Sequence, residues 1–322
     1  MSSKIRVGVL RGGPSHEHEI SIKTGGQVLK SLSEKYQPAD IFIDRFGAWH
    51  FNGIVEAPVK IFKKVDVLFN ALHGEYGEDG TIQNLLETFG VPYTGSGRIA
   101  SAFAMHKVHA KNFLKSYGIK SPYHKLLKKD QLTKQVAFDL WHTVMNPSVV
   151  KPVSLGSSVG VSVARSFAEF ETALEKAFSQ AESALIEEYI SGREATCGII
   201  DNFRDQNEYA LLPVEIAPTT SSFFDYDAKY AKGAELFHPG RFSAMEKTAI
   251  QDLARTVHRS LCLRHYSRSD FIVSPKRGIY FLEVNSLPGL YADSPYAESL
   301  LAVGSSLPEF LDHVLTLALS GK

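Results

Sequence analysis

The stretch that decides the fold runs from Tyr266 to Asn285 and reads YSRSDFIVSPKRGIYFLEVN. Two runs rich in β-branched and aromatic residues, 266–274 and 279–285, flank a Pro-Lys-Arg-Gly turn at 275–278. This pattern is typical of a β-hairpin. We expect one face of the antiparallel pair to pack on a core and the other face to carry polar residues.

The polar residues of the hairpin fall into a register that builds a site. A hairpin symmetric about 275–278 gives all cross-strand pairs one sum of residue numbers, which places Asp270 opposite Glu283. The same sum places Arg268 opposite Asn285, on the same face, because side chains two apart on a strand point the same way. Opposed carboxylates repel unless a positive charge lies between them. A hard cation meets that need, and Asn285 supplies a further neutral oxygen.

The apolar residues of the hairpin support the same register. The sum of residue numbers places Phe271 opposite Leu282. It places Val273 opposite Tyr280, with Val284 beside them. A strand pair packed on a core requires such a face.

The composition indicates a globular protein without a bulk charge preference. The 322 residues suffice for two or three domains, and 44% hydrophobic residues give each a core. Lys plus Arg equals Asp plus Glu at 35 each, so we expect neither nucleic acid nor an anionic membrane as a partner. Cys197 and Cys262 lack metal-ligand spacing and fit free thiols in a reducing cytosol. No apolar run approaches a membrane span, and we expect a cytoplasmic protein.

The order of strand and helix signals predicts an α/β protein of three domains. Residues 1–96 alternate strands and helices, which predicts an open parallel α/β sheet. Residues 97–188 form the second domain, beginning with one long helix from Ile99 to Tyr117. Residues 189–322 are strand-rich, with one strand predicted at 209–216. The segment 217–240 lacks periodicity, and a loop of this length is usually a functional lid or disorder. Its aromatic residues favour the lid.

Candidate phosphate ligands lie in the second domain. Gly156-Ser157-Ser158-Val159-Gly160 is placed to close over anionic oxygens, although a short hairpin turn is the commoner reason for such a sequence. Lys151 lies just upstream, at the end of a predicted strand, and is placed to reach the same phosphates. Lys107 and Lys111, four apart on the long helix, approach from a second direction. Each lysine alone fits a solvated surface side chain.

Acidic and glycine-rich segments add further candidates. Glu187, in the apolar strand 185–190, is placed to accept a hydrogen bond from a base amino group, although an edge strand with solvated acids fits equally well. The glycine-rich segment 73–80 follows a strand of the first domain, where α/β sheets bind their ligands. Glu17 and Glu19, near the start of the first helix, either complement the helix dipole or anchor a ligand ammonium.

Together these segments resemble the ATP-grasp superfamily, and more closely the D-alanine–D-alanine ligases. The resemblance covers nearly the whole chain and keeps the order of seven motifs: Gly12–Ser21, Ala71–Gly80, Pro92–Gly97, Lys151–Gly160, Phe224–Tyr230, Arg268–Asp270 and Glu283–Gly289. It implies an ATP-grasp fold, with a substrate-binding domain at 1–96, a central lid domain at 97–188 and a C-terminal antiparallel-sheet catalytic domain at 189–322. It also implies a homodimer and ATP-dependent synthesis of D-alanyl-D-alanine for peptidoglycan.

The resemblance implies a set of ATP contacts: Lys107, Lys151, Ser157, Ser158, Glu187, Tyr189, Ile190, Glu194 and Lys229. Lys107 and Lys151 would hold phosphates. Glu187, with the backbone of the following Tyr189 and Ile190, would bind adenine, and Glu194 would bind the ribose hydroxyls. Two magnesium ions, or manganese in their place, would bind Asp270, Glu283 and Asn285.

The same resemblance implies the contacts to the amino acids. Glu17, helped by His73, would hold the ammonium of the first D-alanine. Ser294 and nearby backbone would take the carboxylate of the second. Arg268 and the N–H of Gly289 would face the tetrahedral oxyanion. The resemblance also implies that Tyr230 and Ser157 join the lid to the first domain through Glu17.

One departure from the family pattern leaves the acceptor open. Residues 290–295 are unusual after the Pro-Gly pair and lie near the second-substrate site, which keeps D-serine or D-lactate as alternative acceptors. In the family a tyrosine at Tyr230 goes with an amine acceptor. A catalytically silent nucleotide-binding protein is the remaining alternative, against which stands the presence of every expected metal and phosphate residue.

Overall fold

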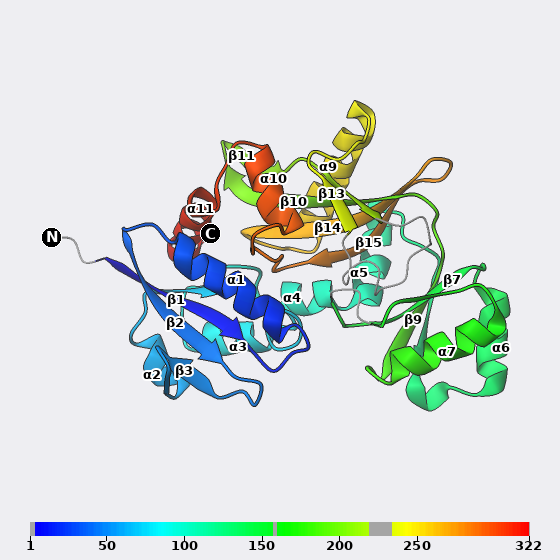
Figure 1. Ribbon diagram of the computed structural model, residues 1–322, viewed down its shortest axis with the longest axis horizontal. Coiled ribbons are helices and arrows are strands. Elements are labelled where there is room, and N and C mark those ends of the chain that lie inside the picture. Colours follow the sequence, from blue (N-terminus) through cyan, green and yellow to red (C-terminus); the bar gives the residue numbers. More distant parts are fainter. Residues whose placement is uncertain (1–3, 157–159, 219–233, 322) are drawn as a thin grey trace.

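The computed structural model describes residues 4–156, 160–218 and 234–321. Its strands form three sheets, of five, four and six strands. Figure 1 shows the five-stranded sheet at the lower left, the four-stranded sheet at the lower right and the six-stranded sheet above and between them.

The five-stranded sheet has the order β4-β3-β2-β1-β5. Its strands are β1 (Ile5–Gly12), β2 (Tyr36–Ile43), β3 (Trp49–Phe51), β4 (Ile54–Val55) and β5 (Val67–Asn70). β1 pairs in parallel with β2 and β5, as the βαβ pattern predicts, and β3 and β4 extend the sheet in antiparallel fashion. One face packs with α1 (His18–Ser31), and the other packs with α2 (Pro58–Phe62) and α3 (Thr81–Thr88).

The four-stranded sheet is antiparallel, in the order β6-β9-β7-β8. Its strands are β6 (His124–Lys128), β7 (Ser148–Pro152), β8 (Ser162–Ala164) and β9 (Ser183–Glu188). A core of aromatic and aliphatic side chains joins one face to α6 (Lys134–Thr143) and α7 (Phe167–Phe178). A short 3-10 helix, η2 (Lys129–Gln131), follows β6.

The six-stranded sheet is antiparallel and carries the hairpin predicted from the sequence. Its strands are β10 (Arg193–Phe203), β11 (Gln206–Ala210), β12 (Val214–Pro218), β13 (Ala234–Phe237), β14 (Tyr266–Ser274) and β15 (Gly278–Asn285). One core joins its back face to α4 (Arg98–Met105), α5 (Lys107–Leu114) and α9 (Ala244–Ser260). The helices α10 (Pro295–Ala302) and α11 (Leu307–Ser320) follow β15.

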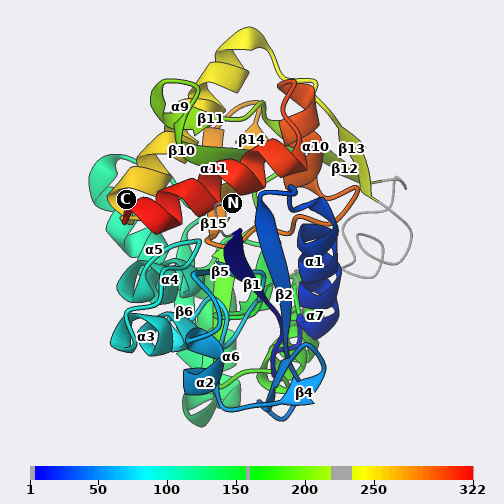
Figure 2. The same cartoon turned by 90° about the vertical axis from the view of Figure 1, so that its left-hand side faces the viewer.

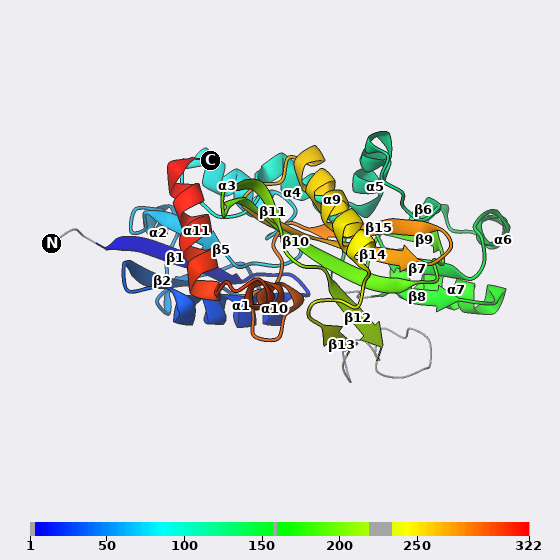
Figure 3. The same cartoon turned by 90° about the horizontal axis from the view of Figure 1, so that it is seen from above.

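The C-terminal helix ties the first sheet to the last. α11 contacts α1 and β5, and its buried side chains share one core with both sheets. Figures 2 and 3 show α11 lying across the N-terminal sheet, with α10 leading into it from the six-stranded sheet. The predicted domain boundaries at 96/97 and 188/189 fall between the sheets, and they stay a prediction.

The predicted long helix from Ile99 to Tyr117 is wrong, because the chain breaks at His106. This residue has extended dihedrals, φ −85 and ψ 94, and separates α4 from α5. Its ring nitrogen accepts a hydrogen bond from the backbone N–H of His109, so it caps the new helix. The last residues, 115–117, form a 3-10 turn, η1 (Lys115–Tyr117).

Two expectations for the middle of the last sheet are also corrected. The predicted single strand 209–216 is two strands, β11 and β12, with residues 211–213 between them. The segment 217–240 is regular at both ends, because β12 and β13 pair with Glu215 opposite Phe237 and Ala217 opposite Glu235. Residues 219–233, which include the remainder of the predicted lid, lie outside the described residues.

The hairpin register is confirmed at the predicted site. Arg268 lies opposite Asn285, and Asp270 lies opposite Glu283. The turn, however, has three residues rather than four, since Ser274 pairs with Gly278. A bulge next to Asp270 offsets that difference of one residue.

The bulge overturns the expected apolar pairs. Phe271 lies opposite Phe281 rather than Leu282, and Val273 lies opposite Ile279 rather than Tyr280. Leu282 and Tyr280 instead pack with Ile272 and Ile190 in a separate cluster. An extra residue in one strand shifts every later side chain to the opposite face. Val284 remains in the core with Phe271, as expected.

No helix in the described ranges is long and apolar enough to cross a membrane.

Gly12 sets the path of the chain from β1 into the first motif. Its φ is +91°, and a Cβ at this position would lie 2.2 Å from the carbonyl oxygen of Ile43. The backbone N–H of Gly12 donates to the hydroxyl of Ser21 at 2.8 Å. Any larger residue must therefore move β2 or the start of α1.

We predict that Gly12→Ala lowers the free energy of unfolding by roughly 3 kcal/mol, through backbone strain and a clash with a carbonyl group. Gly47→Ala is the matched control, because Gly47 has φ +84° with no atom within 4 Å of an added Cβ. It should cost about 1 kcal/mol, the left-handed strain alone. Urea unfolding of both variants measures the difference, and equal losses would contradict the role of the Ile43 carbonyl.

Candidate active site

The three sheets meet around one cavity of about 540 Å³. Its wall contains the described residues that the family resemblance implies: Glu17, His73, Lys107, Lys151, Glu187, Tyr189, Ile190, Glu194, Arg268, Asp270, Glu283, Asn285, Gly289 and Ser294. Two other candidates from the sequence do not line it, because Glu19 is exposed and pairs with Arg45, and Lys111 is buried beside Glu187. The other predicted residues, Ser157, Ser158, Lys229 and Tyr230, lie outside the described residues. Segments from all three predicted domains therefore contribute to a single site.

One end of the cavity has apolar walls and a buried acid. The walls include Val149, Ile190, Ile216, Leu236, Ile272 and Leu282. Glu187, on β9, is 2% exposed, and its Oε1 lies 2.7 Å from Nζ of Lys111. A carboxylate oxygen can accept more than one hydrogen bond. Glu187 therefore keeps acceptor capacity for a donor group of a ligand.

The neighbouring acid, Glu188, is held by other groups. Its carboxylate pairs with Arg277 at 2.8 Å and accepts a hydrogen bond from the backbone N–H of Tyr123 at 2.9 Å. Of the two acids in the apolar strand, Glu187 is therefore the better placed to meet a base, as the sequence analysis expected.

Lysines approach this end from two elements. Lys151, on β7, lies 2.7 Å from Oε2 of Glu187, because the two residues are diagonal neighbours on paired antiparallel strands. Lys107, in the first turn of α5, lies 3.1 Å from Oε2 of Glu283 and donates to the carbonyl of Leu155 at 2.7 Å. Both line the cavity, where positive charge suits phosphate.

The polar face of the hairpin forms the floor of the cavity. Asp270 accepts hydrogen bonds from Thr196 at 2.6 Å, from Arg268 at 3.0 Å and from the amide of Asn285 at 3.3 Å. Burial alone would raise the pKa of Glu283, but the charges of Lys107 and Lys151 lower it below its ordinary value. Both acids are therefore held by cations.

This donor set fits a hard divalent cation. One face of the hairpin carries the carboxylates of Asp270 and Glu283 and the amide of Asn285, in the register described above. Oxygen ligands of this kind are those that magnesium prefers. Within residues 4–156, 160–218 and 234–321 no three His, Cys, Asp or Glu side chains form a metal cluster.

The opposite end of the cavity, at the N-terminal sheet, holds acidic residues. A Cβ on Gly156 would lie 2.4 Å from Oε2 of Glu17, so Gly156 and Glu17 are in close contact. Glu78 is half-buried, and its burial together with the charge of Glu17 raises its pKa. Its carboxylate accepts from the backbone N–H groups of Gly74, at 2.9 Å, and Leu287, at 3.0 Å.

His73 is a neutral member of this end. Burial, followed by the charge of Arg268, lowers the pKa of His73 to about 4. Its Nε2 lies 2.9 Å from the hydroxyl of Thr24, and its backbone carbonyl accepts from Ser15. The charge available for an ammonium group therefore comes from the carboxylates and not from the imidazole.

Ser294 begins α10 at the rim of the cavity. Its hydroxyl donates to the carbonyl of Gly289 at 2.9 Å and caps the helix by accepting from the N–H of Ala297 at 3.3 Å. The structure thus brings Ser294 and the Pro-Gly loop together, as expected for one binding segment.

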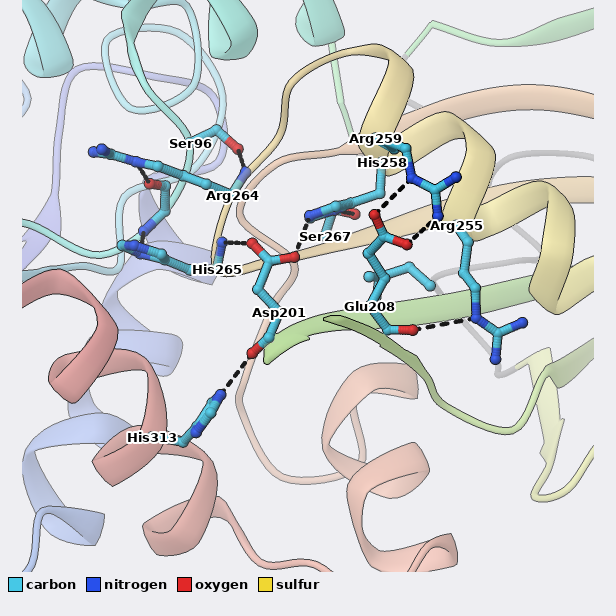
Figure 4. A network of polar contacts seen from close by, with 12 residues as sticks. Ser96, Asp201, Glu208, Arg255, His258, Arg259, Arg264, His265, Ser267 and His313 are labelled. Carbon is cyan, nitrogen blue, oxygen red and sulfur yellow. Dashed lines mark hydrogen bonds and ion pairs between the residues drawn. The ribbon is translucent and has the colours of Figure 1, made fainter. Parts of the chain in front are cut away.

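A polar network behind the sheet fixes the strand that carries Arg268 (Figure 4). Asp201, on β10, pairs with Nε2 of His258 at 3.0 Å and accepts from the backbone N–H of His265 at 2.5 Å. Nδ1 of His258 lies 2.7 Å from the hydroxyl of Ser267, the residue before Arg268. Ser267 is fully buried, so this arrangement of Ser, His and Asp has no access to a substrate.

The same network reaches the first domain and the last helix (Figure 4). Nδ1 of His265 accepts from the backbone N–H of Gly95 at 3.0 Å, and Nε of Arg264 donates to the carbonyl of Gly95 at 2.8 Å. His313, on α11, lies 2.7 Å from the carbonyl of Asp201. The third motif of the first domain is thereby joined to the start of β14.

Two groups at the site were not assigned a role from the sequence. Glu78 belongs to the glycine-rich segment 73–80, and no separate role was predicted for it. An acid that follows a strand of an α/β sheet is nevertheless a signal for a ligand site. Thr196 lies opposite Asp270 on β10, and nothing in its sequence context indicates that contact.

Comparisons with known proteins agree with this arrangement. The chain matches the family described as "D-ala D-ala ligase C-terminus" over residues 113–316, and "D-ala D-ala ligase N-terminus" over 6–61 and 55–96. It is 38% identical to the D-alanine–D-alanine ligase of Geotalea uraniireducens over 317 residues, covering 97% of this chain and 95% of that relative.

Solved structures give the same result. The D-alanine–D-alanine ligase from Coxiella burnetii superposes with a TM-score of 0.84 at 28% identity, covering 99% of this chain and 95% of that chain. The VanG D-Ala:D-Ser ligase from Enterococcus faecalis superposes with a TM-score of 0.85 at 27% identity, covering 98% and 100%.

His73 and Glu78 should make the free energy of unfolding depend on pH in opposite directions. Unfolded His73 takes a proton near pH 6.5 but folded His73 only near pH 4, so the unfolded state binds more protons and stability falls as the pH falls through this interval. The raised pKa of Glu78 makes the folded state bind more protons, so its contribution is lost as the pH rises.

We therefore predict that His73→Gln lowers the slope of unfolding free energy against pH, by up to about 1.4 kcal/mol per pH unit, and that Glu78→Gln raises it. Denaturant titrations between pH 4.5 and 6.5 measure both slopes. His16→Gln, at an exposed position, is the control and should leave the slope unchanged. Identical slopes in all variants would contradict the buried, neutral state of His73.

Proposed function

The chain belongs to the D-alanine–D-alanine ligase family, which has the ATP-grasp fold, and on this premise we propose which residues carry its reaction. The enzyme is an ADP-forming ligase that joins two D-alanines for peptidoglycan precursor synthesis. The observation that carries the assignment of residues is that every described residue implied by the family resemblance lies around one cavity.

In this proposal ATP occupies the end of the cavity with apolar walls. Glu187 accepts a hydrogen bond from the adenine amino group, and the backbone of Tyr189 and Ile190 reads the ring edge. The place of Glu187 in the cavity wall and the remaining acceptor capacity of its carboxylate support this role. Glu194 binds the ribose. Its cross-strand partner is Ile272, and both side chains line the cavity.

Lys107 and Lys151 hold the phosphates, and Asp270, Glu283 and Asn285 hold magnesium. Bound there, magnesium would neutralise charge on the transferring phosphoryl group. Lys107 now pairs with Glu283, and Arg268 with Asp270, so each cation has an acidic partner before the substrates arrive.

The first chemical step makes an acylphosphate. The ammonium of the first D-alanine pairs with Glu17, which directs its carboxylate toward the γ-phosphate of ATP. A carboxylate oxygen attacks the phosphorus, the bond to the bridging oxygen breaks, and ADP leaves. The acylphosphate must be kept from water until the second step, because hydrolysis would waste it.

The second step forms the peptide bond. The carboxylate of the second D-alanine lies near Ser294 and the Pro-Gly loop, and its amine attacks the acyl carbon. Arg268 and the N–H of Gly289 face the resulting oxyanion, which donors placed in advance stabilise most. Phosphate then leaves. The position of Arg268 on a strand fixed from behind by His258 and Ser267 supports this role.

The surroundings of the reaction are also part of the proposal. We place the enzyme in the cytoplasm, where ATP is available, and expect a homodimer, as the family resemblance implies. D-alanine is the proposed acceptor, and D-serine and D-lactate are outcomes of the test below.

We predict that the protein with ATP, magnesium and D-alanine releases phosphate and yields D-alanyl-D-alanine. An equimolar pool of D-alanine, D-serine and D-lactate, analysed by mass spectrometry, should give the D-alanine dipeptide as the main product. A mixed product with D-serine or D-lactate would reassign the acceptor. ATP binding without any ligated product would contradict the proposed reaction.

We predict that Glu283→Gln lowers turnover by about a hundredfold or more, because it removes one charged ligand while keeping the shape of the side chain. Equilibrium dialysis with Mn²⁺ should show weaker metal binding in the same variant. Glu182→Gln, at an acid whose side chain is 87% exposed, is the control. Near-normal turnover and metal binding in Glu283→Gln would remove the hairpin from the metal site.

A further inference from the structure

Lys111 is a buried lysine that the proposed roles leave without a task. Its side chain is 0% exposed, and among the described residues it is not part of the cavity wall. Its Nζ lies 2.7 Å from Oε1 of Glu187 and donates to the carbonyl of Phe281 at 3.3 Å. Lys111 therefore joins α5 to β9 of the four-stranded sheet and to β15 of the six-stranded sheet.

Glu187 has a lysine at each of its oxygens. Lys111 lies 2.7 Å from Oε1, behind the cavity wall, and Lys151 lies 2.7 Å from Oε2, on the wall itself. Burial alone would raise the pKa of Glu187, but the two lysines lower it to about 2, so the carboxylate is charged at neutral pH. The three groups together hold one net positive charge.

This surplus charge depends on Lys111. If Lys111 were uncharged, Glu187 and Lys151 would form a neutral pair, and a phosphate would have to compete with Glu187 for the same ammonium group. A buried carboxylate needs a cation close to it, because an unpaired charge away from water is costly. With Lys151 as its only cation, Glu187 would hold Lys151 more firmly than it does when Lys111 shares the task. The lysine behind the wall thus decides how much charge the lysine on the wall offers to a ligand.

We propose that Lys111 is a positioning residue for the nucleotide: it balances Glu187 from behind, so that Glu187 stays beside the base and Lys151 serves the phosphates. This inference rests on the proposed nucleotide roles of Glu187 and Lys151. Lys111 itself touches neither base nor phosphate.

The decisive variant is Lys111→Met, which keeps the length of the side chain and removes its charge. Calorimetry with magnesium and ADP should show binding weakened by about tenfold or more, the usual effect of losing a charged hydrogen-bonding group. KM for D-alanine, measured at saturating ATP, should stay within about twofold, because the amino-acid end of the cavity is unchanged. Lys115→Met removes the same charge from an exposed lysine just after α5 and should bind ADP as the wild type does.

A purely structural lysine would give a different pattern. It would lower stability and the active fraction without moving ADP affinity relative to the D-alanine KM. ADP affinity within twofold of wild type in Lys111→Met would therefore overturn the proposal.

A second comparison remains decisive if Lys111→Met alone does not fold. In Glu187→Gln the buried acid is neutral, so adding Lys111→Met should change ADP affinity by less than about twofold. A further loss of fivefold or more in the double variant, relative to Glu187→Gln, would show that Lys111 acts independently of Glu187 and would overturn the proposal. These measurements use binding alone, so they are separate from the dipeptide assay, whose failure would concern the proposed reaction.

Discussion

Pairing of buried charges around the cavity is the constraint on which the rest of the structure depends. Removing an ion from water costs several kcal/mol unless a partner of opposite charge is held close to it. Here the partners come from different parts of the chain: Lys107 and Lys111 from α5, Lys151 and Glu187 from the four-stranded sheet, and Glu283 from the hairpin. Helix α5 therefore satisfies charges on both the four-stranded sheet and the hairpin, and the cavity lies where these pairs meet.

The break at His106 makes this pairing possible. A continuous helix from 99 to 117 would carry Lys107 in the middle of a helix, with its direction set by α4. The extended backbone of His106 lets α5 start in a new direction, and its ring caps the first turn. Lys107 then reaches Glu283 and Leu155, while Lys111, one turn later on the same face, reaches Glu187 and Phe281.

The sequence predicted well which residues would line the cavity. It predicted less well which contacts would fix their positions. Order and spacing of motifs gave the cavity wall, and the parallel N-terminal sheet followed from its βαβ pattern. The predicted hairpin register at Asp270 and Glu283 is correct although the turn has three residues and not the predicted four. The bulge next to Asp270 offsets this difference of one residue. A bulge leaves no reliable mark in one sequence, and neither does the helix break, since both depend on tertiary contacts. The partner of each buried charge could not be predicted for the same reason.

The charges of the cavity also differ between its ends. At the N-terminal end, burial and then the charge of Glu17 raise the pKa of Glu78, and His73 stays neutral, so carboxylates are the groups of these three that can carry negative charge there. At the other end, two lysines share one acid at Glu187. An amino acid whose ammonium is drawn to the acidic end has its carboxylate directed toward the basic end, where phosphates are favoured. In the proposed reaction, the geometry that satisfies the buried charges of the folded chain thus also orients the two reacting groups toward each other.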